Sequence, residues 1–494
     1  MKKGTILTDV KIQRLGYKGV GLSTLDDGKK IIVQGGVLPG SIIDCRVIKN
    51  KKDYLECKVV SIKKISEEYM LQDKICPHYF FHKEIVEDDG TIGCGGCKWQ
   101  ILKYENQLAV KDDIVLDSFR HLKSHLDNLY MDSIVPSPVE FGYRNKLEYS
   151  FGKGDGDRNW SLGFHKQGQF SKIVDIHNCR LVTDKNNNIF LYIKDLLLKS
   201  NLPVYEQKSH VGFFRHLAIR EGINTSQFLI NLSVSDKYFD GDNGKKKLWD
   251  SLKNELLESQ YLKNNVNTFV ITYNNGLADI IKGQDIRTEI LWGEGFIYEK
   301  LIYSDEVELT FRISPFSFFQ TNTNGAQVLF STAMENIGKD YGLMLDLYCG
   351  GGSIGLSFLK MGIAKKLIGI EISDDCIYDA KYNAKINGLT QDSYFASGKA
   401  EKLVFEDSYL SQNLENINLV VVDPPREGLH KNVIKFLNDL KKIINYKLLY
   451  ISCNPVTMAS NVEGLIEGGF KIKYLRAVDM FPHTHHMEMI GILN

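Results

Sequence analysis

The pattern of apolar and polar positions changes its character along the chain. Over residues 4–62, short apolar stretches are separated by glycine turns, which is typical of a small β-barrel. Strands are expected over residues 4–10, 15–21, 30–33, 40–48 and 55–62. The first part of the chain is therefore predicted to be a barrel of the oligonucleotide-binding (OB) type.

The middle of the chain mixes two periodicities. Residues 98–123 repeat apolar positions at helical spacing among mixed charges, which predicts an amphipathic helix. Residues 143–310 show mostly strands and turns, with helices near 189–198 and 245–257. This region is predicted to be a mixed α/β domain.

Apolar runs separated by helical segments dominate the last third of the chain. The runs cover residues 343–348, 366–371, 418–423, 448–452 and 487–493. Such alternation predicts a doubly wound parallel sheet with helices on both faces, a Rossmann-like fold. The chain is thus expected to divide into a barrel at residues 1–63, a central domain at 64–310 and a Rossmann-like domain at 311–494.

Length and composition fit this multidomain picture. A chain of 494 residues with 43% hydrophobic content is long enough for about three globular cores. It contains no apolar run of the length that crosses a bilayer, and residues 1–4 lead into a strand pattern and not into a signal peptide. Nine unevenly spaced cysteines suit a reducing compartment, with metal or catalytic use of the thiols. We expect a cytoplasmic monomer.

The charge is unevenly distributed although the formal net charge is zero. Residues 1–64 hold 14 Lys and Arg against 6 Asp and Glu, a net charge of +8. Either this surface is merely solvated, or it contacts a polyanion such as a nucleic acid. Four cations of the central region, which lie beside aromatic residues, would suit a platform for RNA phosphates and bases: Arg144, Lys146, Arg215 and Arg220.

Four cysteines have the spacing of metal ligands. Cys94 and Cys97 enclose two glycines, which let the backbone fold tightly around one metal, and Cys76 lies eighteen positions before Cys94. Cys179, 82 positions after Cys97, is the fourth candidate. Four thiolates without a close histidine pair fit either an iron–sulfur cluster or a zinc site, and the spacing does not choose between them.

A glycine-rich turn follows the first strand of the expected Rossmann-like domain. Gly350, Gly351 and Gly352 allow a close approach to a ligand, and Glu371 ends the next strand, where a carboxylate can bind ribose hydroxyls. A dinucleotide would also fit such a turn. However, Asp346 on the strand favours a cationic ligand, and S-adenosylmethionine is the better match. Asp423, before two prolines, ends a later strand at the same edge and can bind the cofactor or a planar base.

A thiol lies at the end of the strand predicted at 448–452. Cys453 comes just before Pro455, which cannot continue the ladder, so the thiol should lie on a turn at the binding edge of the sheet. An isolated cysteine is more often an inert core residue. The neighbouring motifs favour a chemical role here.

Several motifs together identify a family resemblance. The N-terminal glycine pattern at residues 15–21 resembles a TRAM domain. The wider chain resembles RNA 5-methyluridine methyltransferases of the branch with a TRAM domain and a four-iron, four-sulfur cluster. The motifs lie at residues 94–97, 143–146, 314–320, 346–355, 423–426, 452–455 and 482–488.

That resemblance implies a role for each matched residue. Cys453 matches the nucleophile that adds to uracil C6, and Glu488 matches the base that removes the C5 proton. Four further residues match cofactor or uracil contacts: Gln320, Tyr348, Glu371 and Asp423. The cluster ligands would be Cys76, Cys94, Cys97 and Cys179, with zinc as the alternative metal. The implied partner is RNA, with 23S ribosomal RNA favoured over transfer RNA because this domain combination accompanies that substrate within the family.

The chain departs from the family pattern in three places. Residues 80–93 form a longer, partly acidic insert before the paired cysteines, which affects cluster ligation more than catalysis. Residues 458–461 differ after the nucleophile motif, and Thr321 replaces a common valine. Two other functions are open: a noncatalytic RNA-binding factor, and an amino-group methyltransferase. The second would use an aromatic residue in place of Arg426 and would have no use for Cys453.

Overall fold

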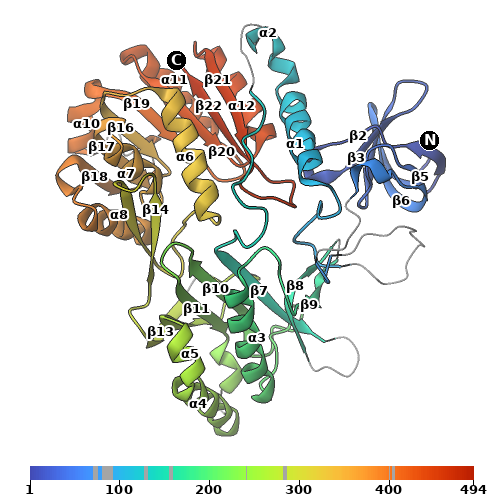
Figure 1. The fold of residues 1–494 in the computed structure, drawn as a ribbon, viewed down its shortest axis with the longest axis vertical. Coiled ribbons are helices and arrows are strands. Elements are labelled where there is room, and N and C mark those ends of the chain that lie inside the picture. The colour runs from blue at the N-terminus through green and yellow to red at the C-terminus, as the bar shows by residue number, and fades with distance from the viewer. Residues whose placement is uncertain are drawn as a thin grey trace.

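The computed structural model describes residues 1–70, 76–79, 93–126, 132–154, 160–167, 169–240, 242–281, 286–399, 401–402 and 407–494. Its strands form three large sheets and one hairpin, and Figure 1 shows the large sheets as separate blue, green and orange-to-red regions. In the described parts of the chain, no helix is long and apolar enough to cross a membrane. The predicted combination of β and mixed α/β regions is confirmed.

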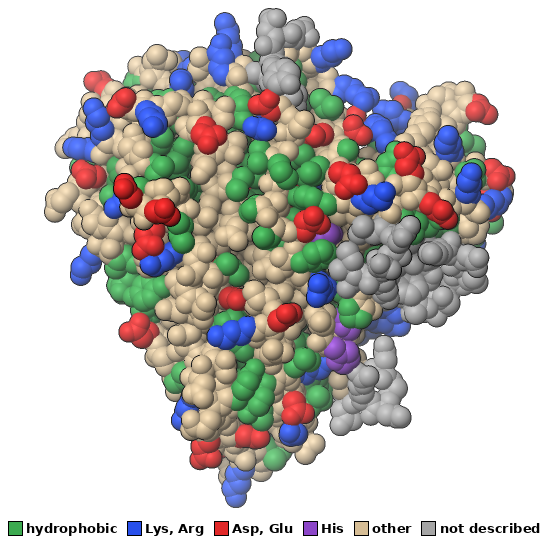
Figure 2. All heavy atoms as spheres, in the orientation of Figure 1, with side chains coloured by type: hydrophobic (Ala, Val, Ile, Leu, Met, Phe, Trp, Pro, Cys, Tyr) green, Lys and Arg blue, Asp and Glu red, His purple; other side chains and the backbone are tan. Residues whose placement is uncertain are grey.

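The N-terminal region is a curled six-stranded sheet in the order β1-β5-β6-β4-β3-β2. Its strands are β1 (Ile6–Lys11), β2 (Arg14–Leu15), β3 (Gly21–Thr24), β4 (Lys30–Gln34), β5 (Ile42–Asn50) and β6 (Tyr54–Lys64). Alternate residues of β5 are buried, so one face of the sheet forms a core. On the face in Figure 2, Lys and Arg side chains of this region are mixed with Asp and Glu.

The prediction of a strand at residues 15–21 is wrong. The chain leaves β2 after Leu15 and forms a 3-10 turn, η1 (Tyr17–Gly19), before β3 begins at Gly21. Lys18 and Gly19 have φ values of +65° and +71°, which a strand does not accommodate. The glycine pattern therefore produces a turn that projects from the sheet.

The helix predicted at residues 98–123 is shorter than expected. It begins six residues later as α1 (Tyr104–Ser118), followed by η3 (Arg120–Leu122) and the short α2 (Lys123–Leu126). Lys98 and Trp99 stay outside the helix because their amides donate to the carbonyl of His483, at 3.1 and 3.0 Å. Figure 1 shows α1 between the N-terminal sheet and the C-terminal sheet.

The central sheet has seven strands in the order β13-β12-β11-β10-β7-β8-β9. They are β7 (Lys146–Lys153), β8 (Trp160–Lys166), β9 (Gln169–Asp175), β10 (Phe214–Gly222), β11 (Gln227–Val234), β12 (Thr268–Asn274) and β13 (Ile286–Trp292). Its helices are α3 (Asp184–Lys199), α4 (Asn243–Glu258) and α5 (Gln260–Asn265), and α3 and α4 contain the two predicted helices.

Two of the four cations predicted for an RNA platform are buried in this region. Arg215 and Arg220 are only 2% and 3% exposed, because every residue of β10 is buried. Arg215 donates to the carbonyls of Asn274, Gly276 and Ala278, and Arg220 donates to the carbonyl of Ser317. These two arginines hold loops together, so the prediction that they form an exposed platform is wrong.

A hairpin of β14 (Ile297–Ile302) and β15 (Glu308–Ile313), followed by α6 (Thr323–Ile337), precedes the C-terminal sheet. That sheet has the order β18-β17-β16-β19-β20-β22-β21, parallel except for β22. Its strands are β16 (Tyr341–Leu347), β17 (Ala364–Glu371), β18 (Ser393–Ser397), β19 (Ile417–Val422), β20 (Lys447–Ser452), β21 (Ile472–Val478) and β22 (Glu488–Leu493). Its helices are α7 (Ser353–Lys360), α8 (Asp374–Ile386), α10 (Ser408–Asn413), α11 (Lys431–Ile443) and α12 (Pro455–Glu467).

All five strands predicted in the last third are present, and the doubly wound arrangement is confirmed. The strands β18 and β21 were not predicted. The first is short and polar, and the second interleaves Lys473 and Arg476 with its apolar residues. The strand order reverses between β16 and β19, and in such sheets the crevice beyond the carboxyl ends at the reversal is the binding site.

Candidate active site

Five of the six predicted cofactor and catalytic residues lie at this one edge of the C-terminal sheet. Strand pairing sets Leu347 beside both Ile370 and Val422, so the residues that follow, Tyr348, Glu371 and Asp423, are neighbours. Ser452 of β20 pairs with Met489 of the antiparallel β22, which places the two remaining residues beside each other. These are Cys453 and Glu488.

Cys453 lies on the turn between β20 and α12. The Asn454 side chain accepts from the amides of Val456 and Thr457, which caps α12 and fixes the turn. Burial, together with the charges of Glu488 and Asp423, raises the pKa of the Cys453 thiol to about 12, although the charge of Arg426 opposes the shift. The thiol is thus protonated in the free protein at neutral pH and lies next to two acids.

Glu488 is a buried acid with an incomplete set of hydrogen bonds. It is 4% exposed, and its Oε2 atom has no hydrogen-bond partner among the described residues. Burial raises its pKa well above the ordinary carboxyl value, the nearby Asp423 adds to the shift, and Arg426 opposes it. An unpaired buried carboxyl of this kind is characteristic of sites that exchange a proton with a ligand.

Asp423 and Gln320 lie between Cys453 and the glycine-rich turn after β16, where the cofactor is expected. Burial raises the pKa of Asp423 to about 7. The Gln320 side-chain amide donates to Asp423 at 3.4 Å, and Gln320 is 5% exposed. Gln320 comes from the segment before α6, so the structure brings the sixth predicted residue to the same edge.

The glycine-rich turn is shaped by buried acceptors. Tyr348 and Gly352 have φ values of +64° and +83°, and the amide of Gly350 donates to Glu371 at 3.3 Å. Glu371 also accepts from the amides of Ile372 and Ser373, at 2.7 and 3.0 Å. Its carboxylate is therefore held in one orientation at the turn.

Two further residues shape the same turn. Asp346 was predicted to favour a cationic ligand, but it is fully buried and accepts from the amide of Gly355 at 3.1 Å. Asn383, which the sequence did not single out, donates to the carbonyl of Gly351 at 2.9 Å. Both side chains act on the backbone of the turn.

Residues outside the C-terminal sheet hold the loop between β21 and β22 in place through hydrogen bonds. Four consecutive carbonyls accept from distant groups: Met480 from Asn322, Phe481 from Lys111, Pro482 from Tyr143, and His483 from the amides of Lys98 and Trp99. This loop leads directly into Glu488. The sequence gave no sign of these contacts, because each joins segments more than 150 residues apart.

A buried ion pair anchors the same loop. Lys111 on α1 donates to Asp479 at 2.5 Å, and both side chains are fully buried. Gln107, one turn earlier, accepts from the amide of His483 at 2.7 Å and contacts its ring at 3.1 Å. The helix α1 thereby fixes both ends of the segment from Asp479 to His483.

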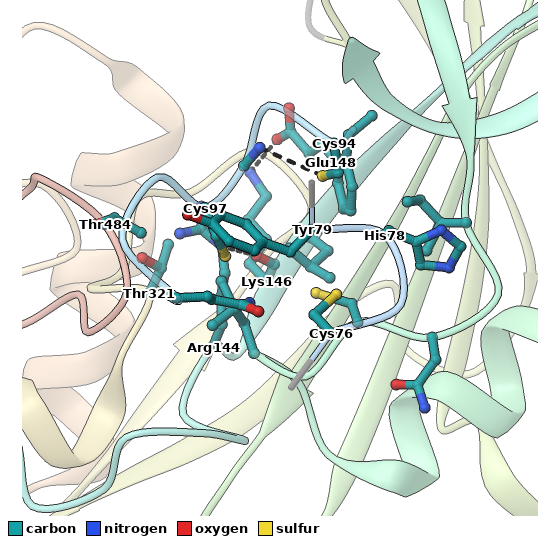
Figure 3. A pocket seen from close by; sticks show the side chains of 18 of the residues that line it. Cys76, His78, Tyr79, Cys94, Cys97, Arg144, Lys146, Glu148, Thr321 and Thr484 are labelled. Carbon is teal, nitrogen blue, oxygen red and sulfur yellow. Dashed lines mark hydrogen bonds and ion pairs between the residues drawn. The ribbon is translucent and has the colours of Figure 1, made fainter. Parts of the chain in front are cut away.

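The four cysteines predicted to bind a metal line one cavity of about 430 Å³. Figure 3 shows Cys76, Cys94 and Cys97 around it, with Arg144 and Lys146 nearby, and Arg426 and His486 also line it. Burial, with a smaller contribution from neighbouring thiols, raises the pKa of Cys94 to about 12 and of Cys179 to about 11.

The four thiols are chemically suitable ligands for a metal or a cluster, but they do not lie close enough together to bind one. Four thiols share one buried cavity, and Gly95 allows tight packing because a Cβ there would meet the His165 carbonyl at 2.9 Å. Across the described ranges, however, no three Cys, His, Asp or Glu side chains lie close enough together to hold an ion. Most of the insert at residues 80–93 lies outside the described residues.

Comparisons with known proteins extend over the whole chain. The sequence model of the tRNA (uracil-5-)-methyltransferase family matches residues 258–494. An uncharacterized RNA methyltransferase of Caldanaerobacter subterraneus is 34% identical over 494 residues, covering 100% of this chain and 99% of the relative. One of Clostridium acetobutylicum is 32% identical and covers 98% and 96%. The crystal structure of Pyrococcus abyssi tRNA (uracil-54, C5)-methyltransferase with S-adenosyl-L-homocysteine is 26% identical, with a TM-score of 0.69 over 99% of this chain and 100% of that one.

Proposed function

We propose, on the premise that this chain belongs to the RNA (uracil-5-)-methyltransferase family, that it methylates C5 of a uridine in 23S ribosomal RNA through Cys453 and Glu488. Methyl transfer from S-adenosylmethionine to RNA uracil is the activity of that family. The observation that carries the residue assignment is the pairing of Ser452 with Met489, which sets the thiol of Cys453 beside the carboxyl of Glu488.

The reaction needs a nucleophile because uracil C5 is too poor in electrons to take a methyl group unaided. The Cys453 thiol gives up its proton to solvent, the thiolate adds to C6, and the electrons of the C5–C6 double bond form an enolate. When bound, S-adenosylmethionine would supply an electrophilic methyl group to C5, with S-adenosylhomocysteine as the leaving group. Arg426, which lowers the pKa of Cys453, favours the thiolate needed for the addition.

Glu488 completes the reaction by removing a proton. After methyl transfer, C5 carries both a methyl group and its original hydrogen. Glu488 takes that proton, the double bond re-forms, and the bond between C6 and the Cys453 sulfur breaks. Glu488 must be ionised to accept this proton; burial raises its pKa, and the nearby charge of Arg426 opposes that shift.

The proposed cofactor contacts are the other residues of the same edge. Glu371 faces the glycine turn, where its fixed carboxylate can accept from ribose hydroxyls. Tyr348 lies on that turn, and Gln320 and Asp423 lie between it and Cys453. The division at residues 1–63, 64–310 and 311–494 is part of this proposal, with the N-terminal sheet as a TRAM domain.

Ribosomal RNA is preferred because we interpret the N-terminal sheet as a TRAM domain and the four-cysteine cavity as a cluster site, a combination that accompanies this substrate within the family. Transfer RNA is the second candidate, since the archaeal enzyme of similar structure is named for uracil 54 of tRNA. Mapping 5-methyluridine in both RNAs after deleting the gene distinguishes them. Loss of a modification only in tRNA would contradict the first choice.

We include an iron–sulfur cluster on Cys76, Cys94, Cys97 and Cys179 in the proposal. Its support is the cavity that the four thiols share. Protein purified without oxygen should contain iron and absorb violet light, and Cys94→Ser should remove both. Stoichiometric zinc without iron would contradict the cluster.

The decisive test uses RNA fragments that contain 5-fluorouridine, mixed with the protein and S-adenosylmethionine. Fluorine at C5 does not leave as a proton, so the protein should stay bonded to the RNA after methyl transfer. We expect an adduct that survives denaturation and is lost in Cys453→Ala. The control is Cys57→Ala, which removes a buried thiol of the N-terminal sheet. No adduct on any ribosomal or transfer RNA fragment would favour a noncatalytic RNA-binding factor.

A further inference from the structure

The turn η1 of the N-terminal sheet reaches the candidate active site. The ring of Tyr17 lies edge-on to the ring of His485, with centroids 5.9 Å apart and an interplanar angle of 77°. His485 lies three residues before Glu488. A residue near the start of the chain thus contacts the loop that carries the proposed base.

Tyr17 also lies close to the nucleophile. Burial raises the pKa of its hydroxyl, the charge of Cys453 raises it further, and the charge of Arg426 lowers it. These charges act over short distances only, so the hydroxyl, the thiol and the guanidinium share one neighbourhood. The side chain is partly exposed and not closed into the core.

The position of Tyr17 is fixed by its neighbours on the turn. Gly19 is pressed against Trp99, because a Cβ on this glycine would meet Trp99 Nε1 at 2.8 Å. The Lys98 side chain donates to the carbonyl of Lys18 at 2.9 Å. Since the amides of Lys98 and Trp99 bind His483, the turn is anchored to the loop that precedes Glu488.

The charges around Tyr17 suit a nucleic acid strand. Lys18 and Arg426 are exposed, and Lys98 is partly exposed. The ammonium group of Lys18 lies 5.9 Å from the centroid of the Tyr17 ring. An aromatic ring flanked by cations is the arrangement with which proteins bind single-stranded nucleic acid, through base stacking and phosphate contacts.

We propose that the Tyr17 ring stacks on the nucleobase next to the target uridine, so that the N-terminal sheet helps to select which uridine enters the site. This inference rests on the proposed function. In the proposed reaction the target base lies against Cys453 and Glu488. The neighbouring base lies beyond them, where the partly exposed ring of Tyr17 beside His485 is available to it.

The test compares Tyr17→Ala, Tyr17→Phe and Tyr54→Ala. Tyr54 is a partly exposed tyrosine of the same sheet, located at the β5–β6 turn, and serves as the matched control. The probe is a synthetic stem-loop copied from whichever 23S or tRNA transcript the wild-type protein methylates. Two further copies are abasic at a nucleotide that flanks the target uridine, one copy on the 5′ side and the other on the 3′ side.

We expect Tyr17→Ala to lower kcat/KM about 10- to 100-fold on the intact stem-loop, as removal of a base-stacking ring does. Tyr17→Phe, which keeps the ring, and Tyr54→Ala should stay within about twofold of wild type. On one of the two abasic copies, wild type and Tyr17→Ala should become equal. A 2-aminopurine at that nucleotide should be quenched by wild type and not by Tyr17→Ala.

Three outcomes would overturn the inference. An unchanged kcat/KM in Tyr17→Ala, while wild type methylates the stem-loop, removes the stacking role and leaves the proposed function intact. An equal loss on intact and both abasic RNAs, without any change in 2-aminopurine fluorescence, shows that Tyr17 only supports the fold. Absence of methylation by wild type on every transcript removes the proposed function and this inference together.

Discussion

Cys453 and Cys97 lie in two thiol sites whose surroundings differ. Burial raises the pKa of both thiols. Around Cys453 the charged neighbours are two acids and one cation, Glu488, Asp423 and Arg426. Around Cys97 the neighbours are other thiols, with Cys179 and Cys94 as the main ones.

The difference shows what each site is suited to do. Around Cys97 the thiols raise one another's pKa, and a metal ion would supply the positive charge that the proposed cluster site needs. The single thiol of Cys453 lies near one cation and two acids, and these surroundings agree with its proposed role as a nucleophile that loses and regains a proton.

The two sites are joined by a short segment. Cys97 is followed directly by Lys98 and Trp99, whose amides bind the carbonyl of His483. The helix α1 then returns to the same loop through Lys111 and Gln107. The following predictions test the two thiol sites and this connection, beginning with the largest expected effect.

The largest effect is expected for Cys453→Ala. Methylation should fall by about 10⁴-fold or more, because the nucleophile is lost. RNA affinity, measured by filter binding, should stay within about threefold of wild type, since affinity comes mainly from phosphate contacts. Retained methylation would show that the thiol of Cys453 is not the nucleophile.

Glu488→Gln should lower turnover by about 10²- to 10⁴-fold, the usual contribution of a general base. Unlike Cys453→Ala, this variant should accumulate a covalent complex with RNA that contains no 5-fluorouridine. The Cys453 thiol can still add to uracil C6, but the C5 proton cannot be removed. The complex is visible as a retarded band in a denaturing gel. A turnover loss without any such band would assign Glu488 a role before methyl transfer.

Lys111→Met should destabilise the protein by about 3–5 kcal/mol, because it leaves Asp479 buried without its partner. The free energy of unfolding is measured by urea denaturation. The double variant Lys111→Met with Asp479→Leu should recover most of the loss, since it removes both charges. A double variant as unstable as the single one would show that shape and not charge holds α1 on the loop.

The smallest effect is expected in the pH dependence of Cys453 alkylation, which tests the environment of this thiol. With a pKa of about 12, Cys453 is protonated at neutral pH, so its reaction with iodoacetamide should accelerate about tenfold per pH unit between pH 7 and 10. Arg426→Gln should be slower than wild type at each pH, because loss of the cation raises the pKa. A rate that is constant above pH 8 would contradict the raised pKa.

Much of the architecture could be predicted because it depends on local pattern. All five strands predicted for the last third are present, and the residues that end four of them, such as Glu371 and Asp423, meet at one edge. In a parallel sheet this follows from strand direction alone. The turn at residues 16–19 and the late start of α1 were missed, since each is fixed by partners outside its own segment.

The sequence by itself determined five strands of the last third, the glycine turn and the positions of Glu371, Asp423 and Cys453 at strand ends. The tertiary structure decided that Arg220 is buried, that Lys111 anchors the loop before Glu488, and that Tyr17 lies beside His485. The reason is physical. Periodicity records which side of an element is apolar, whereas a contact between residues hundreds of positions apart depends on how whole sheets pack.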